Sequence, residues 1–230
     1  MEFLGKVAEL LTTAKYWGMI FEGLKLTIII SVFAAVLGLV LGTLVAMVSI
    51  AKKSPVMNVL KAICNVYITI IRGTPMALQL FIMAYVIFAI RGFPSEITAI
   101  IAFGINSGAY VAENIRAGIL SIDIGQTEAG LALGLPARKT LMKIVIPQAI
   151  KNVIPTIGNE LIALIKETSI VSMIGMYDLT MVAKIIGGGN NMASYIVPMT
   201  VIAVFYLAIV YALTFAIKRI ERRLRASDRR

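Results

Sequence analysis

The sequence predicts an all-α, polytopic membrane protein with five transmembrane helices. Of its 230 residues, 59% are hydrophobic and 15% are charged, whereas soluble domains are about 45–50% apolar and about 25% charged. Several apolar stretches are longer than the ~20 residues that a helix needs to cross a bilayer. The strands of a membrane barrel alternate over about ten residues, and the sequence has no such pattern.

The composition also argues against an enzyme, a metal site and a disulfide framework. The sequence has no histidine and a single cysteine, Cys64. Histidine is the commonest general base and the commonest transition-metal ligand, so we expect neither a catalytic site nor a metal site. One cysteine excludes a disulfide framework. An integral membrane enzyme is therefore a weak alternative, because no acid/base or metal cluster gathers on one side.

The N-terminal segment, residues 1–22, is predicted to be an amphipathic helix at the membrane interface. Its apolar residues recur at helical spacing; they are Phe3, Leu4, Val7, Leu10, Leu11 and Ala14. Tyr16 and Trp17 are the expected headgroup anchors. A loosely structured N-terminus is the alternative.

Residues 23–217 are predicted to form the transmembrane domain. The spans cover about 23–50, 56–90, 96–122, Pro147 or Pro155 to about Met176, and 194–217. The first span holds Gly38 and Gly42, a small-xxx-small pair that favours close packing of helices. Residues 177–193 are expected to form an external loop.

The second span is expected to be broken. Arg72-Gly73-Thr74-Pro75 divides it into halves of about 15 residues, which are too short to span separately. Pro75 lacks a backbone donor and disfavours a helix at Thr74. Non-helical backbone at membrane depth is tolerated only against protein or a water-filled cavity, so the break is expected to face inward.

The basic residues predict the orientation of the chain. With the N-terminus outside, the inner side receives Lys52, Lys53, the 123–151 segment and the 218–230 tail, and the outer side receives Arg91, Lys184 and two N-terminal lysines. Five spans with N-out and C-in satisfy the positive-inside rule. We interpret the basic cytoplasmic tail as a topogenic and anionic-lipid anchor, not as a nucleic-acid patch.

The polar segment 123–147 lies in the cytoplasm in this topology and is longer than a connection needs. We expect a short helix that begins near Glu128 and is stopped by Pro136, and then a second, basic helix. Gly130 and Gly134 lower the helix propensity and permit another surface to come close.

Three motifs carry a resemblance to a known family. Glu128-Ala129-Gly130, Gly134 and Ile144-Val145-Ile146-Pro147 resemble the EAA loop of ATP-binding-cassette (ABC) importer permeases, with glycine and isoleucine in place of an alanine and a leucine. Ile71-Arg72-Gly73-Thr74-Pro75 and Leu164-Ile165-Lys166-Glu167-Thr168-Ser169-Ile170 look like the signatures of polar-amino-acid uptake permeases. The three motifs occur in the right order, and the resemblance covers most of the chain.

The resemblance implies a type I importer fold and several subunits. Two permease subunits, a homodimer or a heterodimer with a paralogue, form the pathway in a bacterial plasma membrane. A separate ABC ATPase binds ATP and Mg and drives the pathway through the EAA loop, and an extracytoplasmic solute-binding protein delivers an amino acid. The coupling residues that it implies are Glu128, Ala129, Gly130, Gly134, Leu135 and Arg138. This chain has no phosphate-binding Gly-x-x-x-x-Gly-Lys-Ser/Thr loop, and we expect no cofactor in it.

Glu160 is the most informative charge inside a span. Ionisable residues within the membrane are costly and usually face a cavity or a partner. Glu160 lies near the middle of the fourth span beside Asn159, and no basic residue lies three or four positions away. We expect both to contact the substrate, and the carboxylate of Glu160 favours a basic amino acid, arginine or lysine.

The third span carries polar residues with two open interpretations. Asn106, Tyr110 and Glu113 share one helical face. Asn106 and Glu113 are candidates for substrate binding. The alternative for Glu113 is a structural ion pair with Arg116, three residues further on.

Arg72 at the predicted break has two open roles as well. With Thr74 it either receives a substrate α-carboxylate or satisfies the carbonyls that the break frees. Lys166 and Glu167 either pair for structure or serve transport. The sequence as a whole predicts the permease subunit of an ATP-driven amino-acid importer. An ATP-independent secondary transporter or channel is the alternative, which five spans and the long cytoplasmic segment disfavour.

Overall fold

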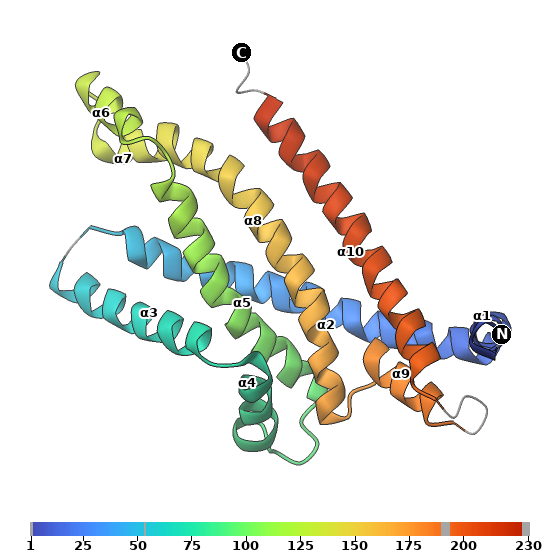
Figure 1. Cartoon of the computed structure of the whole chain (residues 1–230). Coiled ribbons are helices and arrows are strands. Elements are labelled where there is room, and N and C mark those ends of the chain that lie inside the picture. The colour runs from blue at the N-terminus through green and yellow to red at the C-terminus, as the bar shows by residue number, and fades with distance from the viewer. Residues whose placement is uncertain (1, 53, 190–193, 227–230) are drawn as a thin grey trace. The chain divides into compact units, whose positions relative to one another are not determined.

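The computed structural model describes residues 2–52, 54–189 and 194–226, and these residues form helices and no strand (Figure 1). The elements are α1 (Glu2–Thr12), α2 (Ala14–Ile50), α3 (Pro55–Gly73), α4 (Met76–Ile82), the π-helix η1 (Met83–Ile87), α5 (Ser95–Leu120), α6 (Ile124–Ala132), α7 (Ala137–Thr140), the π-helix η2 (Leu141–Val145), α8 (Ile146–Glu167), the 3-10 helix η3 (Thr168–Ile174), α9 (Leu179–Gly187) and α10 (Ile196–Arg225). The all-α prediction is confirmed for the described residues.

The chain divides into two compact units. Unit 1 contains Met1–Ala35, Pro75–Phe103 and Leu161–Leu213, and unit 2 contains Val36–Thr74, Gly104–Glu160 and Thr214–Arg230. The long helices α2, α5, α8 and α10 therefore contribute to both units. The boundary of the units between α3 and α4 falls at the break that the sequence predicted.

Among the described residues, three helices are long and apolar enough to cross a membrane: α2, α3 and α10. A fourth span results if Ala137–Ile174 and Leu179–Gly187, which are bent by 50° at their junction, count as one. Helix α5 has 26 residues but is not among them, because its C-terminal half carries polar and charged residues. The chain is thus a multi-pass membrane protein, whereas five spans and the N-out orientation are not confirmed.

The predicted break in the second apolar region is confirmed. Helix α3 ends at Gly73, Thr74 is extended and α4 begins at Met76. The expectation that both halves are too short to span is wrong for α3, which has 19 residues. Most of the extra length is at the C-terminal end, where Arg72 and Gly73 are still helical. At the N-terminal end the Ser54 Oγ caps the helix by accepting a hydrogen bond from the backbone N–H of Met57 at 3.2 Å.

The segment 177–193, expected as an external loop, contains helix α9 (Leu179–Gly187). The prediction of a loop is therefore wrong, and the external placement stays a prediction. Asp178 caps α9 and accepts hydrogen bonds from the backbone N–H groups of Thr180 and Met181, both at 2.9 Å. The cap satisfies donors that a helix start leaves unpaired. The glycines that suggested a loop begin only where α9 ends, at Gly187, and residues 190–193 lie outside the described residues.

Of the two predicted starts of the fourth span, only the one after Pro147 agrees with the helix, which continues from α7 and η2 into α8. Helix α8 begins at Ile146, and Pro155 lies inside it, so a start after Pro155 is wrong. The helix continues to Glu167, and Gly175 follows η3 with a left-handed backbone, φ 80°. Glu160 therefore lies within α8.

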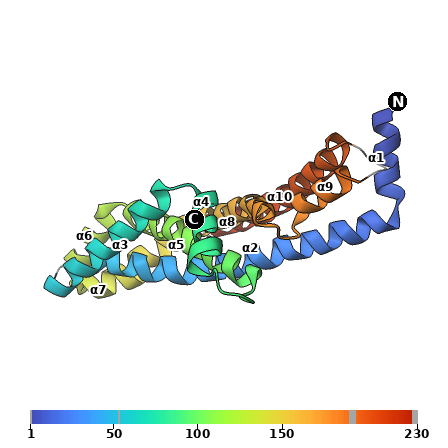
Figure 2. The same cartoon turned by 90° about the horizontal axis from the view of Figure 1, so that it is seen from below.

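The N-terminal helix packs inside unit 1. Helix α1 turns sharply away from the start of α2 (Figure 2), and Leu10 is buried with Ile20 of α2 and with apolar residues of α9 and α10. The Trp17 indole N–H donates to the carbonyl of Leu11 at 2.8 Å, and its ring meets Phe205 edge-on at 5.7 Å. The interfacial placement of this segment stays a prediction.

Close contact between α2 and α5 holds unit 2 together. A Cβ atom on Gly42 would lie 2.6 Å from the side chain of Val111, and one on Gly38 would lie 2.8 Å from Ser107. The two backbones therefore come close where these glycines lie, as the small-xxx-small pair predicted. The Tyr67 hydroxyl adds α3 to this packing by donating to the carbonyl of Ile105 at 2.6 Å.

Candidate functional site

The predicted coupling segment folds as two short helices and a turn. The Asp123 Oδ1 caps α6 by accepting from the N–H of Gly125 at 2.8 Å. The helix thus starts four residues before Glu128, and the expectation that it begins near Glu128 is wrong. It ends at Ala132, and Gly134 follows in the left-handed conformation, φ 77°. Pro136 therefore does not stop this helix but precedes α7.

Gly134 and Gly130 have different environments. A Cβ atom on Gly134 would meet nothing within 4 Å, so the turn needs glycine for its backbone conformation. A Cβ atom on Gly130 would lie 2.5 Å from the Thr140 side chain. The surface that comes close to Gly130 is therefore α7 of the same segment, which packs directly against α6.

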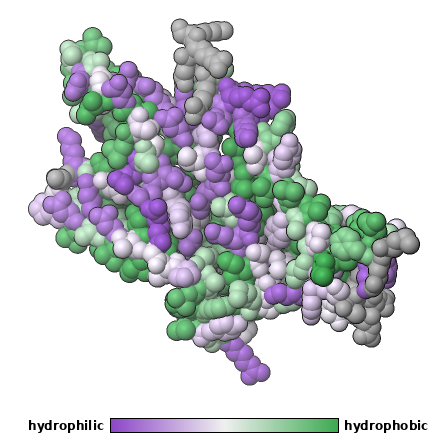
Figure 3. Space-filling view, in the orientation of Figure 1, coloured by the Kyte–Doolittle hydropathy of each residue, from purple (hydrophilic) through white to green (hydrophobic). Residues whose placement is uncertain are grey.

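The outer side of this segment presents apolar and charged residues to its surroundings. Leu131 and Leu133 are 47% and 81% exposed, and the tip of α6 is visibly hydrophobic (Figure 3). Glu128, Ala129 and Arg138 are exposed too, and Leu135 is half-buried. An exposed apolar tip with charges beside it has the character of a docking surface for another protein.

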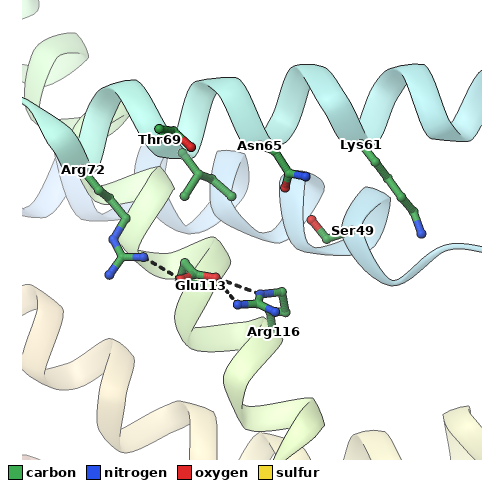
Figure 4. A pocket seen from close by; sticks show the side chains of 8 residues that line it. Ser49, Lys61, Asn65, Thr69, Arg72, Glu113 and Arg116 are labelled. Atoms are coloured by element: carbon green, nitrogen blue, oxygen red, sulfur yellow. Dashed lines mark hydrogen bonds and ion pairs between the residues drawn. The ribbon is translucent and has the colours of Figure 1, made fainter.

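A polar cavity of about 630 Å³ lies in unit 2. Helices α2, α3 and α5 supply its walls (Figure 4). The lining residues are Ser49, Lys61, Asn65, Ile68, Thr69, Arg72, Glu113 and Arg116. This volume is within the range of small-molecule sites, about 300–1,000 Å³.

One carboxylate and two guanidinium groups meet in this cavity. Glu113 Oε2 accepts from Arg72 Nη1 at 2.5 Å, and Glu113 Oε1 lies 2.8 Å from Arg116 Nε and 2.7 Å from Arg116 Nη2. The guanidinium of Arg72 also lies over the Tyr110 ring, 5.3 Å from its centroid, a favourable cation–π distance. The predicted Glu113–Arg116 pair is therefore present.

The pair between Arg72 and Glu113 was not predicted. The two residues are 41 positions apart, and helical spacing reveals only neighbours three or four positions apart. The sequence did contain one usable signal: a charged residue within a membrane span usually needs a partner, so Arg72 was expected to have one. The Thr74 hydroxyl, directly after the end of α3, donates back to the carbonyl of Ile70 at 2.8 Å.

The other candidate substrate residues do not line this cavity. Asn106 is buried in α5, whereas Asn159 is exposed and Glu160 is half-buried on α8. The structure thus brings Arg72 and Glu113 together and leaves the Asn159–Glu160 pair as a separate feature of unit 2. Lys166 borders a smaller hollow of about 270 Å³ in unit 1, beside Ser169, Thr180 and Tyr206.

Residues 38–226 match a family described as "Binding-protein-dependent transport system inner membrane component". The chain belongs to this family. The arginine transport system permease protein ArtQ of Bacillus subtilis (strain 168) is 39% identical over 211 residues, which are 91% of this chain and 94% of ArtQ. The glutamine transport system permease protein GlnP of Escherichia coli (strain K12) is 36% identical over 213 residues, which are 90% of this chain and 93% of GlnP.

A solved structure agrees with this membership. It is described as "Crystal structure of an amino acid ABC transporter with histidines". Its TM-score with this chain is 0.84 and the sequence identity is 36%. The match covers 93% of this chain and 98% of the chain in that structure. The resemblance drawn from the three motifs is therefore confirmed. The chain is a transport subunit and not an enzyme, and the ATPase of such a system is a separate subunit.

Proposed function

We propose that this chain forms the pathway of an ATP-driven amino-acid importer in a bacterial plasma membrane. The observation that carries the proposal is the coupling segment, where the spacing of the EAA loop coincides with a closely packed pair of helices and an exposed apolar tip. A secondary transporter has no need of such a surface. The relatives support an amino-acid substrate through their names, which specify arginine and glutamine.

The proposal includes several partners. An ABC ATPase, which holds ATP and Mg, docks on α6 and α7 and contacts Glu128, Ala129, Gly134, Leu135 and Arg138, while the buried Gly130 serves coupling by letting α6 and α7 pack together. A second permease, identical or paralogous, completes the pathway, and an extracytoplasmic solute-binding protein delivers the substrate. The family's description as a binding-protein-dependent system supports these partners.

The topology of the proposal is five spans with the N-terminus outside. It counts α5 as a span despite its polar C-terminal half, because the two charged residues of that half, Glu113 and Arg116, face the cavity instead of lipid. It places the coupling segment and the end of α10 on the cytoplasmic side. Cysteine labelling from each side of the membrane tests it, with Lys15→Cys reactive from outside and Lys139→Cys reactive from inside.

The substrate of the proposal is a basic amino acid. Glu160 supplies a half-buried carboxylate in α8, with Asn159 beside it, and we assign these two residues to the substrate side chain. A cation in contact with a desolvated carboxylate gains more than the same cation in water. Arg72, Thr74, Asn106 and Glu113 are the remaining residues assigned to the substrate.

Glu160→Gln tests this assignment. In the reconstituted complex of permease, ATPase and binding protein, we expect arginine uptake to fall by about tenfold or more, because a charge-assisted contact is lost, while glutamine uptake falls much less. Glu96→Gln, an exposed carboxylate at the start of α5, is the matched control. Unchanged affinity and transport of arginine and lysine would remove Glu160 from the substrate site.

Dependence on ATP separates the proposal from its alternative. The same proteoliposomes are loaded with ATP or with a non-hydrolysable analogue, and amino-acid uptake is measured. We expect uptake only with ATP. Uptake that persists without hydrolysis would favour a secondary transporter or channel.

A further inference from the structure

We infer that the polar cavity of unit 2 binds the α-carboxylate and α-ammonium groups of the transported amino acid and is indifferent to its side chain. This inference rests on the proposed function and deepens it. The Asn159–Glu160 pair would then read the side chain, and the cavity would read the part that all amino acids share.

The first support is the polar face of α3. Lys61, Asn65, Thr69 and Arg72 lie on one side of this helix, because they recur at helical spacing. The opposite face is apolar and exposed, with residues also at helical spacing: Val59, Ile63, Val66 and Ile70. Helix α3 therefore separates an apolar surface from a polar cavity wall.

The second support is the charge of the cavity. Lys61, Arg72 and Arg116 supply three positive charges and Glu113 one negative charge, so the wall carries a net charge of +2. A simple anion would gain from the positive charges but would be repelled by Glu113. A zwitterion fits both signs, since its ammonium group can lie at Glu113 and its carboxylate at a guanidinium.

The third support is the spacing of these groups. Glu113 contacts Arg72 and Arg116 at 2.5–2.8 Å, so any group bound at the carboxylate lies beside both guanidiniums. The ammonium and carboxylate groups of an amino acid are attached to the same carbon and need this arrangement. A guanidinium has five N–H donors, and Arg72 donates one of them to Glu113 in this structure.

The ion pairs of the cavity can be exchanged for a ligand. The side chains of Arg72, Glu113 and Arg116 are 39%, 27% and 47% exposed. Ion pairs in contact with water contribute little to stability, so a zwitterion can replace the Arg72–Glu113 contact without a large penalty. A weak, exchangeable site suits a molecule in transit.

Indifference to the side chain follows from the rest of the wall. Ile68 is the one apolar residue among those that line the cavity in the described chain, so no apolar pocket selects a side chain by shape. The Lys61 Nζ donates to the carbonyl of Ala51 at 2.6 Å, which places one end of the cavity at the α2–α3 connection. In the proposed topology this is the cytoplasmic end, where substrate is released.

The test compares amino acids with their decarboxylated forms. Binding of arginine against agmatine, and of glutamine against 4-aminobutanamide, is measured by competition on the permease–ATPase complex without binding protein. For the native complex we expect each amino acid to bind about tenfold or more tightly than its decarboxylated partner. Arg72→Gln is expected to bring both ratios close to one and to leave the decarboxylated ligands unaffected.

Controls make the result specific. Arg91→Gln, an exposed arginine of unit 1, is expected to keep both ratios, and Arg72→Lys to restore them in part. If Arg72→Gln does not assemble, Arg116→Gln carries the same expectation. Unchanged ratios, or an equal loss for all four ligands, would overturn the inference. Failure of the proposed function is a different result, because the native complex would then show no ATP-driven amino-acid uptake.

Discussion

The coupling segment and the polar cavity are built in opposite ways. The segment is local: its cap, its turn and the contact of Gly130 with Thr140 all lie between residues 123 and 145. The cavity is assembled from three helices, and its central ion pair joins residues 41 positions apart. Both belong to unit 2, so they differ not in their location but in how far apart in the sequence their contacting residues are.

This difference has consequences for function. The segment is compact, but α7 continues through η2 into α8, and the Gln148 side-chain amide of α8 donates to the Gln126 side chain of α6 at 3.3 Å. A partner that pulls on the segment therefore also pulls on α8. A cavity whose groups come from separate helices changes whenever those helices shift. Helix α5 leads from Glu113 of the cavity to the Asp123 cap of the segment, so it connects the segment to the cavity.

The largest expected effect comes from the turn of the coupling segment. Gly134→Glu places a side chain at a positive φ, which L-residues rarely adopt, and adds a negative charge beside the exposed tip. We expect uptake and binding-protein-stimulated ATPase activity to fall by about tenfold or more, with membrane insertion intact. Amino-acid binding in the cavity is expected to stay unchanged, which separates the two regions.

The control for this variant is Gly134→Asn. Asparagine tolerates the left-handed conformation and brings no charge, so we expect a much smaller loss. Normal stimulated ATPase activity and uptake in Gly134→Glu would remove the segment from the mechanism.

The next effect concerns the helix contact that supports the cavity. Gly42→Leu forces a side chain between α2 and α5, where a Cβ atom alone would lie 2.6 Å from Val111. The Gly108 carbonyl oxygen lies 2.8 Å from the same position and belongs to the backbone, which cannot move aside easily, so the cost belongs at the upper end of the about 1–3 kcal/mol that is typical of overpacking. We expect a lower thermal unfolding temperature in detergent and weaker amino-acid binding.

Gly18→Leu is the matched control for that substitution, because a Cβ atom on Gly18 meets nothing within 4 Å on the same helix. Equal unfolding temperatures for the two variants would show that the α2–α5 contact contributes little to stability.

The same contrast explains how much could be predicted from the sequence. Local signals succeeded: Pro75 located the break, and the spacing of Glu113 and Arg116 gave their ion pair. The missed α9 had a local signal as well, since Asp178 precedes apolar residues at helical spacing, but the glycines after it suggested a loop. Helix α9 was missed because the glycines were given more weight than the N-cap residue Asp178, although both signals are in the sequence.

The errors over long distances have another cause. Arg72 pairs with Glu113 and lies over Tyr110 because α3 packs against α5, and a single sequence contains no information on which helix faces which. The same limit affects the count of spans. Helix α5 is too polar to count as an apolar span, and its charged residues Glu113 and Arg116 line a cavity that exists only because three helices pack together.

The smallest expected effect tests whether the coupling segment is as local as its contacts indicate. Asp123→Ala removes the N-cap of α6, which typically costs about 1 kcal/mol. If the segment is a self-contained unit, this loss stays within it. Hydrogen exchange should then show protection of the α6 amides reduced by about fivefold, with α3 and α5 unchanged, and Asp123→Asn should keep most of the protection. Reduced protection that spreads to α5 and the cavity would mean that the segment and the cavity form one cooperative structure. The distinction between a locally built coupling segment and a cavity assembled from three helices would then have to be abandoned.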